Sequence, residues 1–322
     1  MALAALPDPP QTWEEARPLL RSILRPATYA SLRRDGEAVA WRQPVSAFAN
    51  ELVAVDFPQA RLIVTVENTS LWGVGWREVF AAGRENVAAL HPVSTDVSCT
   101  EAPAFYDVEQ ATYISSAILT PGWLAGFGRP EGPRPVAFVP SEDVLLIGSD
   151  DPEEGAKFFE VAEKMYCEAE RPVSPEGFTV RGGRLVPFDK AGPHPLRSLA
   201  VRARTCAAFR QYEEQTEFLK RTYEEDLVAV YVAAAQVIET GHGLASATVW
   251  GEGVTYDLPE VDYILFISNN GERFVVPFSV VVDIVGIVPT AAGFPRRYRV
   301  SGWPEPALME YLRLHAVPLN AS

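Results

Sequence analysis

The sequence predicts an α+β protein of two domains, with mixed or mainly antiparallel sheets and helices packed on one face. Short runs rich in Val and Ile, bounded by turn residues, are typical of strands. Segments with apolar residues three and four positions apart predict amphipathic helices between them. The segment Ala191-Gly192-Pro193-His194-Pro195 is typical of a linker. Since 322 residues suffice for two cores, we expect domains at 1–190 and 196–322.

Residues 134–166 form the unit around which we expect the first domain to be built. Two runs rich in Val and Ile, 136–139 and 144–147, are separated by a turn and predict a buried β-hairpin. Asp151 before Pro152 predicts a helix N-cap with proline at the first helical position. The expected order is therefore strand, turn, strand and capped helix.

Two helices are expected before that unit. Thr12 and Glu15 form a capping box, and the apolar spacing that follows predicts a helix over 12–24. A second apolar stripe predicts a helix over 76–90, with Gly83 in its interior. Glycine costs about 1 kcal/mol there relative to alanine, so we expect it to permit close packing of the helix on a sheet.

Strands make up most of the remaining first domain. Alternation over 52–57 predicts a strand whose Val53, Val55 and Phe57 face the core. Gly182-Gly183 predicts a two-residue hairpin turn. The other expected strands are 39–45, 61–66, 104–108, 178–181 and 184–188, and short helices or turns are expected at 113–119 and 121–127.

The second domain is expected to begin with a long helix. Residues 196–225 contain no Gly or Pro and carry an apolar stripe. Asn269-Asn270-Gly271 predicts a hairpin turn, because Asn and Gly tolerate positive φ. The expected strands are 227–238, 245–250, 263–268, 273–277 and 297–300, and the expected short helices are 278–288 and 305–316. The order over 263–288 repeats that of 134–166, which leaves convergence and an old duplication both open.

Charge and cysteine content restrict the partners and the compartment. The chain has 42 acidic and 28 basic residues, a formal net charge of −14. This excess repels nucleic-acid phosphates and anionic lipids, so we expect no nucleic acid and no membrane as partner. No apolar stretch predicts a membrane span, and the N-terminus lacks the basic region of a signal peptide. Cys99, Cys167 and Cys206 are far apart and fit small buried thiols in a reducing, cytoplasmic environment.

Motifs of the common catalytic and metal sites do not occur in the sequence. The four histidines lack metal-ligand spacing. There is no nucleophile elbow, no Walker sequence and no complete dinucleotide-binding glycine pattern. We therefore expect no metal and no cofactor.

The candidate site residues come from turns and from aromatic positions. Carboxylates near the central hairpin are the acid or base candidates, with Asp143 and Asp150 ahead of Glu67. The binding candidates are Trp72, Trp76 and His242. Each also has a structural interpretation: Asp150 as a partner of the helix dipole, the tryptophans as core and His242 as an exposed hairpin loop.

Short motifs between about residues 60 and 190 carry a family resemblance. They are Trp72-Gly73-Val74 before a helix, Tyr113 with Ser115-Ser116, and Pro140-Ser141-Glu142-Asp143 followed by the strand run and Gly148-Ser149-Asp150-Asp151. This part of the chain resembles the uncharacterised bacterial protein family typified by YtpQ. The family has no established activity, so the resemblance implies no site residues, and the chain after residue 195 falls outside it.

Two functions remain as expectations. The absence of recognisable catalytic motifs favours a non-enzymatic protein-interaction or regulatory accessory module, whose partner is another protein or a second copy. The alternative is a small-substrate hydrolase or transferase that uses the carboxylates near the central hairpin, because catalytic groups can be assembled from scattered positions.

Overall fold

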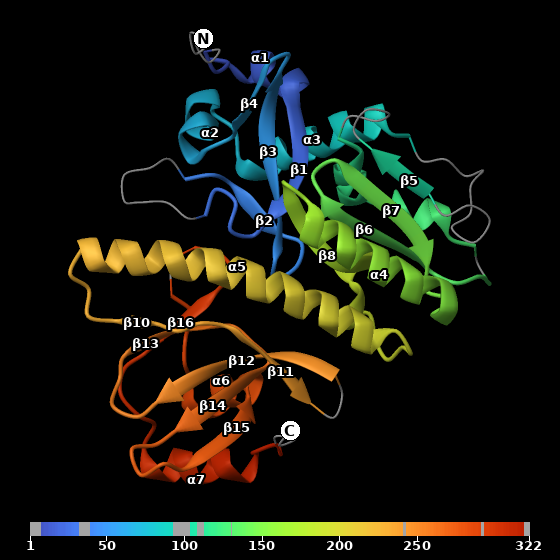
Figure 1. Ribbon diagram of the computed structural model, residues 1–322. Helices are drawn as coiled ribbons and strands as arrows, with labels where there is room; N and C mark the ends of the chain where they lie inside the picture. The colour runs from blue at the N-terminus through green and yellow to red at the C-terminus, as the bar shows by residue number, and fades with distance from the viewer. Residues whose placement is uncertain are drawn as a thin grey trace. The chain divides into compact units, whose positions relative to one another are not determined.

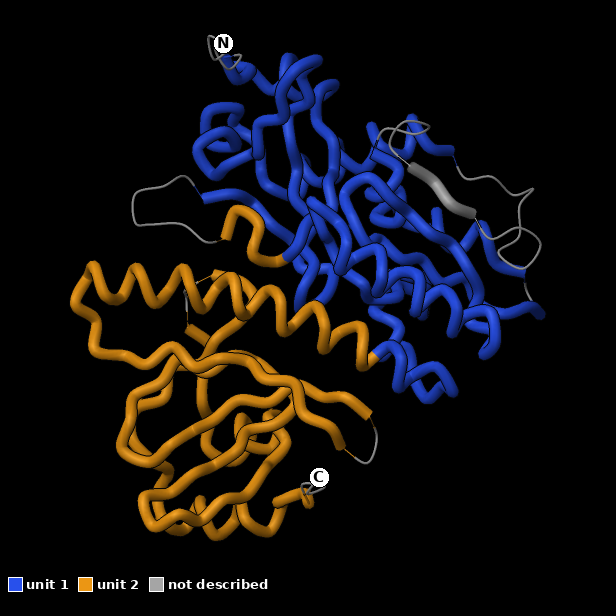
Figure 2. Tube along the Cα trace, in the orientation of Figure 1, with its two compact units in different colours: residues 1–26, 35–200 blue, residues 27–34, 201–322 orange. Residues whose placement is uncertain are grey.

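The computed structural model describes residues 8–31, 39–92, 104–107, 113–129, 131–240, 243–290 and 293–318. Contacts between residues divide the chain into two compact units (Figure 2). Unit 1 comprises residues 1–26 and 35–200, and unit 2 comprises residues 27–34 and 201–322. Antiparallel and mixed sheets with separate helices confirm the predicted α+β class (Figure 1). The predicted domain boundary near residue 192 concerns independent folding and stays a prediction, which limited proteolysis of the 189–196 segment would check.

The first sheet of unit 1 is antiparallel, with strand order β1-β3-β2 and β4 also paired to β3. Its strands are β1 (Leu20–Pro26), β2 (Arg42–Pro44), β3 (Ala49–Phe57) and β4 (Ala60–Ile63). The helices of this part are α1 (Trp13–Ala16), the 3-10 turn η1 (Arg17–Leu19), α2 (Val66–Trp72) and α3 (Trp76–Leu90). Helix α3 packs on β1 and β3 at Gly83, where a Cβ would lie only 2.9 Å from Ser22 Oγ. The expected close approach at this glycine is confirmed.

The predicted helix over 12–24 is wrong beyond its first turn. Thr12 caps α1 by accepting a hydrogen bond from the Glu15 N–H, but the helix ends at Ala16. The chain from Leu20 to Pro26 then pairs with β3. This pairing satisfies the backbone groups of β1, and its apolar residues are buried as in a strand covered on both sides. Tertiary pairing thus overrides a spacing that is equally compatible with a helix.

The prediction that Val53, Val55 and Phe57 face the core is confirmed, because all three pack in one hydrophobic cluster. The opposite face of this strand is also buried. Val53 and Val55 are buried, but Leu52 and Ala54, which point to the opposite face, are buried as well. Phe57 is only half-buried. Strand β3 is therefore a central strand with protein on both faces.

The second sheet of unit 1 contains the predicted central unit and is antiparallel, with the order β5-β7-β6-β8-β9. Its strands are β5 (Ala104–Asp107), β6 (Pro135–Ser141), β7 (Val144–Ser149), β8 (Pro172–Arg181) and β9 (Arg184–Pro187). Helix α4 (Pro152–Glu168) follows β7, and Asp151 caps it as predicted. At Gly148 a Cβ would lie 2.6 Å from the Phe158 ring, so only glycine lets α4 pack this closely on the sheet. The predicted strand-turn-strand-helix unit is confirmed.

The opposite face of this sheet is covered by 3-10 turns. These are η2 (Ile114–Leu119) and η3 (Leu124–Phe127), while η4 (Phe188–Lys190) follows β9. Side chains of η2 and η3 form one buried cluster with inward residues of β6, β7 and β8. This cluster also supplies the floor of the pocket described below.

Unit 2 contains most of helix α5 (Arg197–Glu225), which confirms the predicted long helix, and two small sheets. One sheet consists of β10 (Tyr231–Val232), β13 (Tyr256–Pro259) and β16 (Arg297–Val300), and the other of β11 (Gln236–Thr240), β12 (Gly243–Gly251), β14 (Tyr263–Ile267) and β15 (Arg273–Pro277). Helices α6 (Phe278–Val285) and α7 (Pro306–Leu314) complete the unit. The hairpin turn before β15 is confirmed, with Gly271 at φ +87°.

The predicted single strand over 227–238 is wrong. The chain leaves α5 in a turn and divides its extended residues between β10 and β11, which belong to different sheets. The apolar composition of this segment correctly predicts extended residues. It does not predict where the chain passes from one sheet to the other.

The core of unit 2 is built around a buried arginine. Arg297 on β16 is 1% exposed, and its guanidinium donates to five acceptors at 2.6–3.5 Å. The acceptors are Gln215 Oε1, Thr216 Oγ1 and the carbonyl oxygens of Tyr212, Ala233 and Asp257. An arginine has five N–H donors, so each has an acceptor. Burial lowers the pKa of Arg297 to about 10, and the group remains charged at neutral pH.

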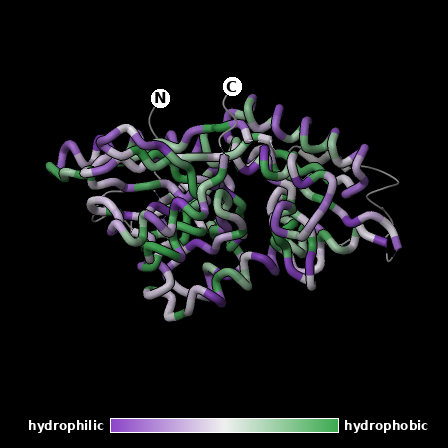
Figure 3. Tube along the Cα trace, turned by 90° about the horizontal axis from the view of Figure 1, so that it is seen from below, coloured by the Kyte–Doolittle hydropathy of each residue, from purple (hydrophilic) through white to green (hydrophobic). Residues whose placement is uncertain are grey.

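Hydropathy varies along the chain rather than concentrating in one helix. Hydrophilic and hydrophobic segments alternate along the trace (Figure 3). Within the described residues, no helix combines the length and the apolar character needed to cross a bilayer.

The expectation of buried thiols is wrong for Cys167, which is exposed, whereas Cys206 is partly buried. Cys99 lies outside the described residues.

Candidate functional site

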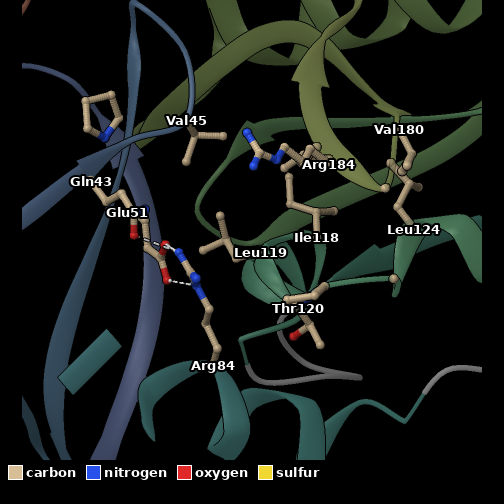
Figure 4. A pocket seen from close by; sticks show the side chains of 15 residues that line it. Gln43, Val45, Glu51, Arg84, Ile118, Leu119, Thr120, Leu124, Val180 and Arg184 are labelled. Atoms are coloured by element: carbon tan, nitrogen blue, oxygen red, sulfur yellow. Dashed lines mark hydrogen bonds and ion pairs between the residues drawn. The ribbon is translucent and has the colours of Figure 1, made fainter. Parts of the chain in front are cut away.

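A pocket of about 500 Å³ lies within unit 1, between its two sheets (Figure 4). One wall comes from β2 and β3, and the opposite wall comes from the β8–β9 hairpin. Residues of η2 and η3 and the segment that connects them supply the floor. The lining side chains are polar on one side and aliphatic on the other, so the pocket is amphipathic.

The polar side is a buried ion pair. Glu51 on β3 accepts hydrogen bonds from Arg84 at both carboxylate oxygens, with Arg84 Nε at 2.8 Å from Oε1 and Nη2 bonded to Oε2. Ser22 Oγ donates to Oε1 at 2.8 Å. The same Nη2 donates to Gln43 Oε1 at 2.8 Å, which connects β2 to α3. Gly83 makes this geometry possible, because the close approach of α3 brings the next residue, Arg84, within reach of β3.

The two partners differ in their exposure to solvent. The Glu51 side chain is 1% exposed, while that of Arg84 is 29% exposed. Burial raises the pKa of the Glu51 carboxyl, and the hydrogen bonds from Arg84 and Ser22 oppose this rise. The hydrogen bond to Glu51 raises the pKa of Arg84, so the arginine stays charged beside the pocket. The pair neutralises itself and adds no net charge to the site.

A second arginine gives the pocket its net positive charge. Arg184, at the start of β9, is exposed and has no hydrogen-bond or ion-pair partner in the described part of the chain. Figure 4 shows it extending from the hairpin toward Val45. Thr120 also lines the pocket, but its Oγ1 is buried, is not accessible to a ligand and lacks a hydrogen-bond partner among the described residues. The aliphatic lining consists of Val45, Ile118, Leu119, Leu124, Val180 and Leu185.

None of the sequence-predicted candidates that the structure describes lines this pocket. Asp143 lies in the β6–β7 turn, where Arg171 Nη2 contacts its Oδ2 at 2.6 Å. The neighbouring Glu142 bonds Arg171 and the buried Arg25, so this turn is a network of ion pairs. The prediction that a carboxylate here acts as an acid or base remains untested.

Asp150 is buried at the end of β7. Its Oδ1 and Oδ2 accept hydrogen bonds from the backbone N–H and the Nε of Arg134, both at 2.7 Å. His194 Nε2 lies 3.6 Å from Oδ2, and His194 Nδ1 accepts the N–H of Leu196 at 3.2 Å. Both ring nitrogens of His194 are therefore engaged by protein groups. This arrangement attaches the segment after β9 to the central unit and gives Asp150 a structural role.

The remaining candidates lie elsewhere in the first sheet region or outside the described residues. Glu67 is exposed in the first turn of α2. Trp72 is buried, with Nε1 donating to the Pro10 carbonyl at 2.8 Å, and the half-buried Trp76 packs on Trp41 and Phe80. His242 lies outside the described residues.

Two sequence signals point to the pocket in retrospect. Glu51 directly precedes an apolar strand run, and Gly83 lies inside a predicted helix just before an arginine. Neither signal shows that the two positions meet, because they are far apart in the chain. Arg184 carries no sequence signal at all, since an arginine after a Gly-Gly turn is typical of an exposed hairpin.

Among the residues that the structure describes, no group of three or more His, Cys, Asp or Glu side chains is arranged to hold a metal ion. Comparison of the chain with protein-family models, with curated protein sequences and with solved structures found no match. The resemblance to the YtpQ-type family therefore stays a prediction, and the site has to be interpreted from its own chemistry.

Proposed function

We propose that this protein is a cytoplasmic, non-enzymatic interaction module that recognises another protein through the pocket of unit 1. The occupant is an aliphatic side chain flanked by a carboxylate. The aliphatic lining favours burial of an apolar group, at about 25 cal/mol per Å² of apolar surface removed from water. Arg184 supplies a charge that selects an acidic neighbour, because arginine binds carboxylates through paired donors.

One observation carries the proposal. Arg184 lies beside aliphatic side chains, and its guanidinium has no hydrogen-bond or ion-pair partner in the described part of the chain. A purely structural arginine is expected to have its donors bonded, as those of Arg297 are. Arg84, on the opposite side of the pocket, is already neutralised by Glu51. The combination is typical of a recognition pocket, in which a few polar groups orient an apolar ligand.

A peptide library displayed on phage tests the proposal. We expect the full chain to select peptides with Leu, Ile or Val next to Asp or Glu, and Arg184→Glu to weaken their binding at least tenfold. Lys164→Glu is the matched control, because Lys164 is an exposed residue of α4 that does not line the pocket and the charge change is the same. Failure to select any peptide, or equal binding by Arg184→Glu, would contradict the proposal.

The enzymatic alternative stays a prediction without a structural observation that favours it. Asp143 and Asp150 lie near the central hairpin as expected, but each is paired with an arginine.

A further inference from the structure

The second residue after α5, Leu227, has an unfavourable local conformation. Leu227 lies at φ +55°, the left-handed region, and is 90% exposed. The Val228 N–H donates to the Tyr223 carbonyl at 2.8 Å, which is the hydrogen bond of a Schellman helix end. Glycine is the usual residue at the left-handed position of this motif, and a branched side chain is strained there. Local stability therefore does not explain the presence of a leucine.

The charges beside Leu227 are also unfavourable for the helix. Glu224, Glu225 and Asp226 are exposed at the C-terminal end of α5. The helix dipole places partial negative charge at this end, so acidic side chains there destabilise the helix. Three carboxylates and the negative end of the dipole therefore lie next to an exposed leucine, one turn beyond Lys220 and Arg221.

Other exposed apolar residues follow Leu227 in the chain or stand on the segment that pairs with β10. Val228, Tyr231 and Val254 are exposed, and the Tyr231 N–H bonds the Thr255 carbonyl at 2.9 Å, which joins β10 to the strand next to Val254. We call these four residues, Leu227, Val228, Tyr231 and Val254, the Leu227 knob. An exposed apolar side chain next to carboxylates is the kind of occupant that we propose for the pocket of unit 1.

We propose that the Leu227 knob of one copy of this chain occupies the unit 1 pocket of a second copy. Leu227 packs on the aliphatic lining, and Arg184 of the receiving copy pairs with the acidic residues at the end of α5. Charge complementarity supports this choice of occupant, because the chain as a whole is strongly acidic while the pocket has two arginines and one glutamate. The inference rests on the proposed function of the pocket and names its partner.

The interface is heterologous, because knob and pocket are different surfaces. Each copy offers one knob and one pocket, so the contact generates rings or open chains rather than a closed twofold dimer. This property gives the proposal a specific test. A copy with a defective pocket and a copy with a defective knob still have one intact contact between them.

Sedimentation velocity of the full chain and two variants provides that test. Arg184→Glu inactivates the pocket. Leu227→Asp inactivates the knob with no added backbone strain, because Asp tolerates left-handed φ better than Leu. We expect the wild-type chain to associate at concentrations up to about 0.2 mM. Each variant alone should associate at least tenfold more weakly, and an equimolar mixture of the two should form a 1:1 dimer. Leu314→Asp is the matched control, because Leu314 is an exposed leucine at the end of α7.

Three outcomes would overturn the proposal: a monomeric wild-type chain, association that survives Leu227→Asp, or no dimer in the mixture. The Leu227→Asp chain also separates this inference from the proposed function. If it binds library peptides through Arg184 while the wild-type chain does not self-associate, the pocket recognises a different protein and only the second-copy inference fails.

Discussion

Unit 1 and unit 2 each contain an arginine that several protein groups bind, and the two arginines are stabilised in different ways. Arg84 in unit 1 pairs with the buried carboxylate of Glu51 and is partly exposed at a pocket. Arg297 in unit 2 is fully buried, and the groups that bond its guanidinium are carbonyl oxygens, an amide and a hydroxyl. The Asp257 carboxylate bonds Arg299 and Tyr223 instead, and only the Asp257 carbonyl accepts from Arg297.

The comparison distinguishes an arginine that only supports the fold from arginines that line a pocket. Arg297 joins α5 to three other segments and leaves no donor for a ligand. The Glu51–Arg84 pair closes one side of a cavity, and Arg184 on the other side keeps its donors available. Substitutions at these positions should therefore change the free energy of unfolding by different amounts and with different pH dependence.

Arg297→Met should have the largest effect on stability. The change leaves several buried acceptors without donors, each costing about 1–3 kcal/mol, so we expect unfolding free energy to fall by about 4 kcal/mol or more. Urea unfolding followed by circular dichroism measures it. Arg273→Met, at an exposed arginine, should change stability by less than about 0.5 kcal/mol. A loss below about 1 kcal/mol at Arg297 would show that desolvation of the guanidinium cancels its hydrogen bonds.

Arg84→Met should have a smaller effect that depends on pH. It leaves Glu51 buried without its cation, so we expect a loss of about 2–3 kcal/mol at pH 7. Burial already raises the pKa of Glu51, and removal of Arg84 raises it further. A carboxyl whose folded pKa exceeds its unfolded value destabilises the fold as pH rises through the folded pKa. The difference from wild type should therefore shrink when unfolding is measured at pH 5, and a constant difference would contradict this account.

Asp262→Asn should show the opposite pH dependence in unit 2. Burial alone would raise the pKa of Asp262, but the charge of Arg204 and hydrogen bonds from Ser246 outweigh it and hold the pKa below its ordinary value. The stability from such a carboxylate is present above the unfolded pKa of about 4 and is lost as pH falls through the folded pKa. We expect Asn to cost about 1–2 kcal/mol at pH 7 and less at pH 3, measured by urea unfolding. An equal cost at both pH values would exclude the ionised pair as the cause.

Leu227→Gly should have the smallest effect and the opposite sign. Glycine relieves the left-handed strain, which we expect to stabilise the chain by about 0.5–1 kcal/mol after its larger unfolded-state entropy is included. Thermal unfolding should show a higher midpoint, while sedimentation should show weaker self-association. Greater stability with unchanged association would mean that the leucine is strained for another reason.

Local sequence signals predicted the features that depend on neighbouring residues. Asp151-Pro152 predicted the start of α4, and Asn269-Asn270-Gly271 predicted the turn before β15. These signals act through φ preferences and hydrogen bonds within a few residues, so they need no knowledge of the rest of the fold. The long helix after the linker was predicted for the same reason, since nothing in 197–225 breaks it.

Only the tertiary structure decided which segments pair and which side chains meet. Residues 20–26 have a spacing compatible with a helix, but they form a strand because β3 offers its free backbone groups along the same length. The pocket brings together Glu51, Arg84 and Arg184 from positions far apart in the chain. A charged residue in a sequence has the same local appearance whether solvent, a carboxylate or a cavity lies beside it. Its role depends on desolvation and on the neighbouring charges, and both arise only when the chain has folded.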